Sequence, residues 1–102
     1  MELIRGTTPT ITFTFDSIDP ASIITADLTI TQCGKTIVNR SQSTMTVGNT
    51  TVSWKLTQEE TLAFQSGLEC FAQIRYKTTD NNVYASPIGS MRVCDILKDG
   101  VL

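Results

Sequence analysis

A strict alternation of threonine and apolar residues over 10–15 (Thr-Ile-Thr-Phe-Thr-Phe) constrains the fold more than any other stretch of the sequence. In an extended chain the three apolar side chains share one face, and Thr10, Thr12 and Thr14 share the other. Threonine is β-branched and keeps a hydroxyl for water, so the pattern predicts a strand with one wet face. Because Thr and Ser make up about a quarter of the chain, we expect more strands of this kind.

Short alternating segments recur along the rest of the chain, separated by turn formers such as Gly34, Gly48-Asn49 and Asp80-Asn81-Asn82. The strands are expected at 24–31, 36–40, 51–56, 68–78, 83–86 and 91–97, with 41–46 left open between an edge strand and a loop. Thr57-Gln58-Glu59-Glu60 matches a capping box, which predicts one short helix over about 58–65. The sequence therefore predicts an all-β, antiparallel sandwich of about seven strands, in a single domain over residues 1–102.

The composition argues against common active sites. The chain has no histidine, which excludes Ser-His-Asp and Cys-His sites and removes the commonest general base. The acidic residues fall in turns, at the helix cap and near the C-terminus, where each has a structural role. We therefore expect a non-enzymatic protein with no cofactor and no metal.

Three cysteines, Cys33, Cys70 and Cys94, are far apart in the sequence and form no metal-binding spacing. We expect them to be buried small hydrophobic residues in a reducing compartment. One disulfide plus a free thiol is the alternative.

Charge and hydropathy argue against two classes of partner and against export by a signal peptide. The net charge is −2, and the Lys and Arg residues are scattered, so we expect neither nucleic acid nor a membrane as a partner. The N-terminus lacks the basic and apolar regions of a signal peptide. The protein is thus expected to stay in the cytoplasm unless it leaves as part of a larger particle.

Three aromatic residues bear on binding. Trp54 alternates in register with Val52 and Leu56, which predicts a core residue rather than a platform for a sugar. Tyr84 lies beside a turn, which makes it the better candidate for an exposed contact; the alternative is a packed ring with only its hydroxyl in water. Phe71 falls on the mostly polar face of its strand, so it either covers the short helix or belongs to a patch that meets another subunit.

The order of features resembles the immunoglobulin-like domains of tailed-phage and prophage structural proteins, above all the N-terminal domain of baseplate upper proteins. The resemblance covers nearly the whole chain. It is carried by the opening Arg5-Gly6-Thr7, by a middle section of strand, Leu56-Thr57, short helix, Gly67 and strand, and by Gly89-Ser90-Met91-Arg92-Val93 near the end. It implies an immunoglobulin-like sandwich in a virion component that docks onto identical or neighbouring tail proteins. Baseplate proteins continue into long helical regions, whereas this sequence ends at residue 102.

Together these features predict a structural or assembly protein of a phage tail or baseplate, assembled in the host cytoplasm and then located in the virion. Its partners would be other tail proteins or itself, bound through edge strands and an apolar patch. The residues expected at the interface are Thr10, Thr12, Thr14, Phe71 and Tyr84. A carbohydrate- or ligand-binding module is the alternative.

Overall fold

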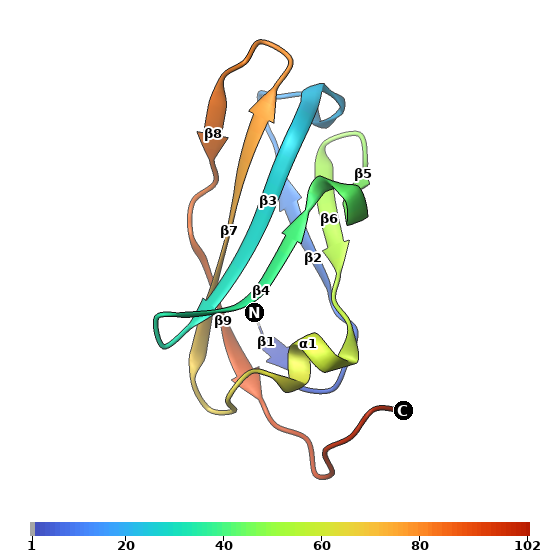
Figure 1. The fold of residues 1–102 in the computed structure, drawn as a ribbon, viewed down its shortest axis with the longest axis vertical. Coiled ribbons are helices and arrows are strands. Elements are labelled where there is room, and N and C mark those ends of the chain that lie inside the picture. The colour runs from blue at the N-terminus through green and yellow to red at the C-terminus, as the bar shows by residue number, and fades with distance from the viewer. Residues whose placement is uncertain (1) are drawn as a thin grey trace.

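The computed structural model describes residues 2–102, which form two β-sheets packed face to face (Figure 1). The larger sheet has the strand order β1-β9-β7-β3-β4, with β8 pairing the end of β7 beyond β9; the smaller sheet has the order β2-β6-β5. The strands are β1 (Glu2–Ile4), β2 (Thr10–Thr14), β3 (Ile23–Gln32), β4 (Lys35–Ser41), β5 (Thr46–Val47), β6 (Thr51–Lys55), β7 (Glu69–Thr78), β8 (Val83–Ala85) and β9 (Gly89–Cys94). The predicted all-β sandwich is confirmed.

The distribution of strands between the sheets matches that of an immunoglobulin-type sandwich. The strands of the smaller sheet, β2-β6-β5, correspond to the second, fifth and fourth strands of an immunoglobulin domain. In the larger sheet, β3, β7 and β9 correspond to its third, sixth and seventh strands. Nine strands are present in residues 2–102, against about seven expected, since β1 and the two-residue β5 carry little sequence signal. All pairs are antiparallel except one: β1 runs parallel to β9, with Leu3 opposite Val93.

The core lies between the sheets and is built by the alternating residues of both. The long central strands β3 and β7 pair over most of their length, with Leu28 opposite Ile74 and Ile30 opposite Ala72. Trp54 of β6 is fully buried between the sheets, and its indole and the Phe13 ring meet edge to face. The prediction that Trp54 is a core residue is confirmed.

The turns explain why the strands meet in this register. Cys33 and Gly34 both have positive φ, 52° and 75°, as a two-residue type I′ hairpin requires, and they place Gln32 opposite Lys35.

The hairpin turn holds Cys33 in an exposed position, so the expectation that this cysteine is buried is wrong, although Cys70 is buried. Cys94 is half-buried, and its thiol contacts the Glu2 carboxylate, which raises the pKa of the thiol.

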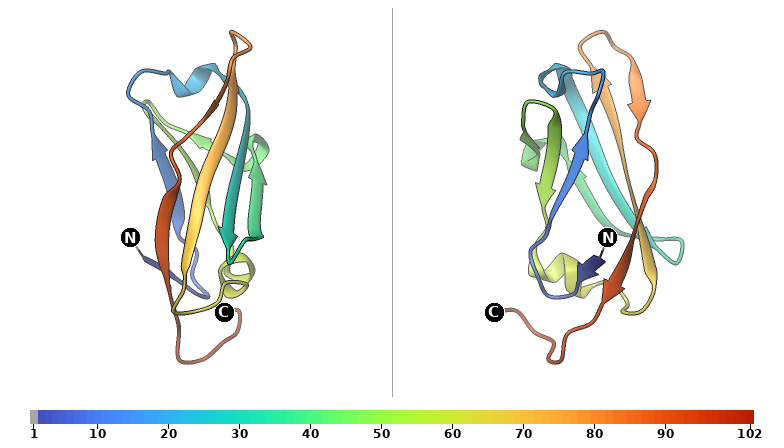
Figure 2. Two further views of the ribbon diagram at one scale, coloured as in Figure 1. Left: turned by 90° about the vertical axis from the view of Figure 1, so that its left-hand side faces the viewer. Right: turned by 180° about the vertical axis from the view of Figure 1, so that it is seen from behind.

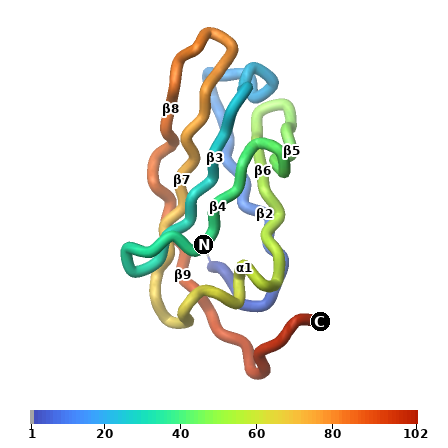
Figure 3. The backbone as a smooth tube through the Cα atoms, viewed as in Figure 1, coloured from blue at the N-terminus to red at the C-terminus, as the bar shows by residue number. Residues whose placement is uncertain are grey.

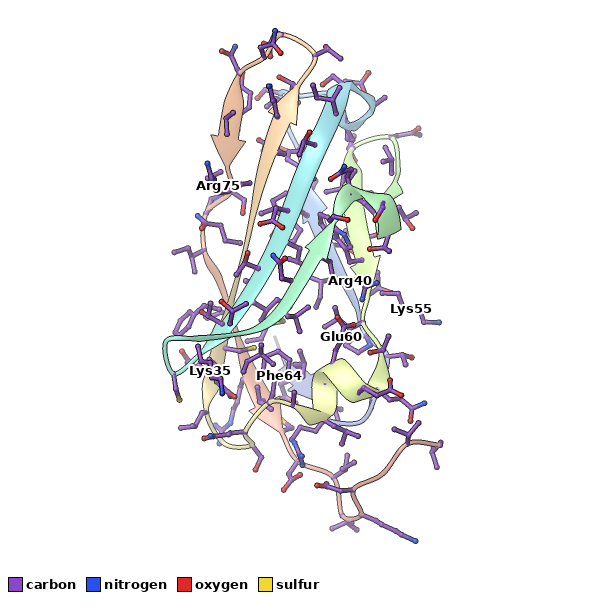
Figure 4. The ribbon with its side chains drawn as sticks, viewed as in Figure 1. Lys35, Arg40, Lys55, Glu60, Phe64 and Arg75 are labelled. Atoms are coloured by element: carbon purple, nitrogen blue, oxygen red, sulfur yellow. The ribbon has the colours of Figure 1, made fainter. Side chains whose placement is uncertain are left out.

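Two short 3-10 segments and one helix complete the fold: η1 (Pro20–Ser22), η2 (Gln42–Thr44) and α1 (Gln58–Leu62). The predicted capping box is present, because the Thr57 hydroxyl accepts from the Glu60 amide and the Glu60 carboxylate accepts from the Thr57 amide. The helix ends at Leu62, three residues before the expected end. It lies across one end of the sandwich, where Phe64 fills the core beneath it (Figure 4).

Arg5 joins the N-terminal strand to the helix and to the C-terminal segment. Its guanidinium donates to the carbonyls of Leu62 and Phe64, at 3.0 and 2.9 Å, and forms ion pairs with Asp95 and Asp99. The tube drawing shows that the C-terminal segment passes this end of the molecule (Figure 3). The Ile96 amide and the Arg5 side chain both lower the pKa of Asp95. The Arg5-Gly6 pair of the resemblance therefore has a structural role here.

Candidate interaction surface

The predicted interface residues lie on three different parts of the sandwich. Thr10, Thr12 and Thr14 are exposed on the outer face of the smaller sheet, on its edge strand β2. Phe71 is 42% exposed on the outer face of the larger sheet, away from α1. Tyr84 is half-buried on β8. The side chains expected to act together are thus not on one face.

Tyr84 belongs to an aromatic cluster at the far end of the sandwich. Its ring stacks on that of Tyr76, with centroids 5.4 Å apart, and the rings of Phe15 and Tyr76 meet edge to face. Burial raises the pKa of Tyr76. Since Trp54 is buried, a sugar-binding site would depend on Tyr84 for its aromatic platform.

An open hollow of about 320 Å³ borders Tyr84 at this end. It is lined by the polar turns that follow β2 and β7, including Asp19 and Asp80. Both carboxylates are held by local hydrogen bonds: Asp19 accepts from the Ala21 amide, and Asp80 from the Thr78 hydroxyl and the Asn82 amide. These bonds lower the pKa of Asp80. The residues serve the turns, as the sequence predicts for them.

The backbone of β2 is free along one side. In its antiparallel pairing with β6, Phe15 donates to the Thr50 carbonyl at 2.8 Å and Leu56 donates to the Pro9 carbonyl at 2.9 Å. Because hydrogen-bonded residues alternate along an antiparallel strand, the odd-numbered residues face β6. The amides and carbonyls of Thr10, Thr12 and Thr14 therefore point away from the sheet.

A groove of about 250 Å³ lies next to this free edge, in the opening between the two sheets. The left view of Figure 2 shows this side of the molecule, with β2 in the smaller sheet and β9 in the larger one. The groove is lined by Ile11, Thr12, Phe13, Ala72, Pro87, Ile88, Gly89, Ser90 and Met91. None of these residues is charged, and the only polar side-chain groups are the hydroxyls of Thr12 and Ser90, so the groove is suited to apolar contact.

Ile88 extends this apolar surface onto the larger sheet. It is 64% exposed and also borders a shallow hollow on the outer face that includes Phe71. Pro87 and Gly89 flank it where the chain passes from β8 to β9, and Ser86 anchors the crossing because its amide donates to the Ile74 carbonyl. Ile88 therefore borders both the groove that Thr12 lines and the hollow that Phe71 lines, along the rim of the sandwich where the two sheets open.

The sequence predicted a break between the strands at 83–86 and 91–97 but did not single out the exposed Ile88 within it. An apolar residue enclosed by Pro and Gly between two strands was the available signal, because such a residue cannot alternate into the core with its neighbours. The free edge of β2 had no signal in the sequence, since strand order depends on contacts between distant segments.

Residues 2–102 contain neither a candidate metal site nor a membrane-spanning helix. No group of three or more Asp, Glu or Cys side chains is positioned to hold a metal ion in this part of the chain. None of its helices is long and apolar enough to cross a membrane.

In comparisons with known proteins, no family model and no curated protein sequence matched this chain.

Proposed function

We propose that this chain is a non-enzymatic structural protein of a phage tail or baseplate, which acts by docking onto other tail proteins or onto itself. The observation that carries the proposal is the side of the sandwich where the free edge of β2 borders an apolar groove. Backbone groups that point outward can pair with another strand, and the apolar lining can be buried by the same partner. The resemblance of the sequence to baseplate domains is the reason for proposing a phage tail or baseplate as the assembly.

Exposed apolar side chains support an assembly role further. Ile88 and Phe71 are both more than 40% exposed and lie near one another on and beside this rim. A cluster of exposed apolar residues next to polar strands is typical of surfaces that meet other proteins. Docking would place them out of water in the assembled particle.

The proposal is tested by the composition of phage particles from the strain that carries the gene. Particles released after prophage induction would be purified on a density gradient and analysed by mass spectrometry, with an abundant cytoplasmic enzyme as the control for contamination. We expect the chain to be enriched with the tail proteins relative to that enzyme. If it is abundant in the cells but no more enriched in the particles than the enzyme, the proposed function is wrong.

A further inference from the structure

We infer that a second copy of this chain pairs with the outer edge of β2, joining the two smaller sheets into one continuous sheet. The inference rests on the assembly role proposed above, for which it names the surface and the partner. Thr10, Thr12 and Thr14 present three amides and three carbonyls to one side, with the strand spacing that an added strand needs.

The β2 edge differs from the other sheet edges in lacking any protection against pairing. Proteins protect such edges with charges, prolines, bulges or very short strands. β4 carries Lys35 and Arg40, whereas β1, β5 and β8 have three residues or fewer. β2 has five residues, pairs with β6 without a register shift, and lies in a stretch, 6–15, with no charged residue.

Because the β2 edge carries no charge, a second copy of the same uncharged strand is a suitable partner for it. An antiparallel pair centred on Thr12 would place Thr12 opposite its equivalent and Thr10 opposite Thr14. Threonine pairs across strands are favourable, and no like charges would meet on either strand. An acidic or basic partner segment, in contrast, would find no complementary charge along this edge.

The groove beside the edge would add apolar contact to the strand pair. Thr12 and Ile88 line the same groove, so an axis through Thr12 brings the two copies' Ile88 residues toward each other on the inner side of the joined sheet. Burial of Ile88, now 64% exposed, is favourable. A five-residue strand spans roughly 17 Å, which is short for a stable interface. The dimer is therefore reversible, with a dissociation constant of roughly 10 µM to 1 mM.

Sedimentation velocity from about 10 µM to about 1 mM tests the pairing, because the dimer fraction must rise with concentration. Thr12→Pro removes an outward amide at a position where an edge strand tolerates proline, and Thr12→Lys adds the charge that protected edges carry. We expect each to weaken dimerisation at least about tenfold. Thr36→Lys, on an exposed threonine of the β4 edge, is the matched control and leaves the dimer unchanged.

Amide hydrogen exchange locates the contact. The outward amides of Thr10, Thr12 and Thr14 should exchange at least about tenfold more slowly at high concentration, while exposed amides elsewhere keep their rates. If Thr12→Pro fails to fold, Thr12→Lys, checked by circular dichroism, still decides the outcome. A strict monomer at about 1 mM, or a dimer that survives the folded Thr12 variant, overturns the inference.

The two proposals fail separately. A chain found in particles but monomeric in solution contradicts pairing at β2 and leaves the structural role intact. A chain that dimerises through β2 but is absent from particles contradicts the phage role and leaves the pairing intact.

Discussion

The two long sides of the sandwich, where the sheets meet at their edges, are built differently. On the β4–β6 side, polar bonds cross from one sheet to the other: Arg40 of β4 donates to the Lys55 carbonyl of β6, and the Trp54 indole donates to the Ser41 carbonyl. Arg40 also pairs with Glu60 of α1 at 2.6 Å, and Figure 4 shows these two residues close together, between β4 and α1. On the β2–β9 side, the sheets are separated by an apolar groove.

The contrast indicates that the closed β4–β6 side mainly stabilises the fold, whereas the open β2–β9 side is available for binding. The closed side satisfies its buried polar groups internally and leaves little for a partner to bind. The open side leaves backbone groups and apolar side chains exposed to water, at a cost that binding can recover. We therefore expect substitutions on the closed side to change the free energy of unfolding and those on the open side to change association.

The largest effect is expected for Trp54→Ala on the closed side. Trp54 is fully buried, and its truncation leaves a cavity and removes the indole hydrogen bond to the Ser41 carbonyl. Loss of a buried aromatic side chain lowers the free energy of unfolding by about 3–5 kcal/mol, measured by urea denaturation. Trp54→Phe, which retains a ring, should cost clearly less. A loss below about 1 kcal/mol for Trp54→Ala would show that this side is not closely packed.

Arg40→Met is expected to have an intermediate effect. The substitution keeps the apolar stem but removes bonds to Glu60, Thr44 and the Lys55 carbonyl, which join β4 to α1 and β6. Because the Arg40 and Glu60 side chains are only 20% and 22% exposed, we expect a loss of about 1–2 kcal/mol in the free energy of unfolding. Arg75→Met, on the exposed face of β7, is the matched control and should change stability by less than about 0.5 kcal/mol.

A double-mutant cycle with Glu60→Gln separates the ion pair from the other bonds. Coupling of about 0.5 kcal/mol or more between positions 40 and 60 supports a link across the closed side. Additive effects would mean that the link depends on the Lys55 carbonyl and Thr44 alone, and would weaken the contrast between the two sides.

The closed side was more predictable from the sequence than the open side. The alternation of Val52, Trp54 and Leu56 indicates burial, and the capping box places Glu60 at a helix start, because both signals involve neighbours within a few residues. Arg40 gave no such signal, since Lys55 and Glu60, its partners on β6 and α1, are 15 and 20 residues away in the sequence. Six of the seven predicted strands were located to within one residue at each end, as local alternation allows. The seventh, predicted at 91–97, is β9, which ends three residues earlier at Cys94.

The free edge on the open side results from the order of strands in the smaller sheet, which cannot be predicted from local sequence patterns. Thr10, Thr12 and Thr14 were expected at an interface made by edge strands, but alternation alone does not tell that their strand lies at an edge or that their backbone groups face outward. Phe71 was expected either over the helix or in an exposed patch; it lies on the outer face, near Ile88. Ile88 itself was missed, because a single apolar residue between Pro and Gly has no period from which to judge its burial.

The smallest change in stability is expected for Ile88→Ser on the open side. Since Ile88 is 64% exposed, its loss should change the free energy of unfolding by less than about 0.5 kcal/mol. Val38→Ala on β4, where valine is 2% exposed, is the comparison and should cost about 1–2 kcal/mol by urea denaturation. Similar losses at the two positions would mean that the rim is packed as tightly as the β4 side. A near-zero loss at Ile88, together with weaker association in sedimentation, means that Ile88 contributes to binding and not to folding.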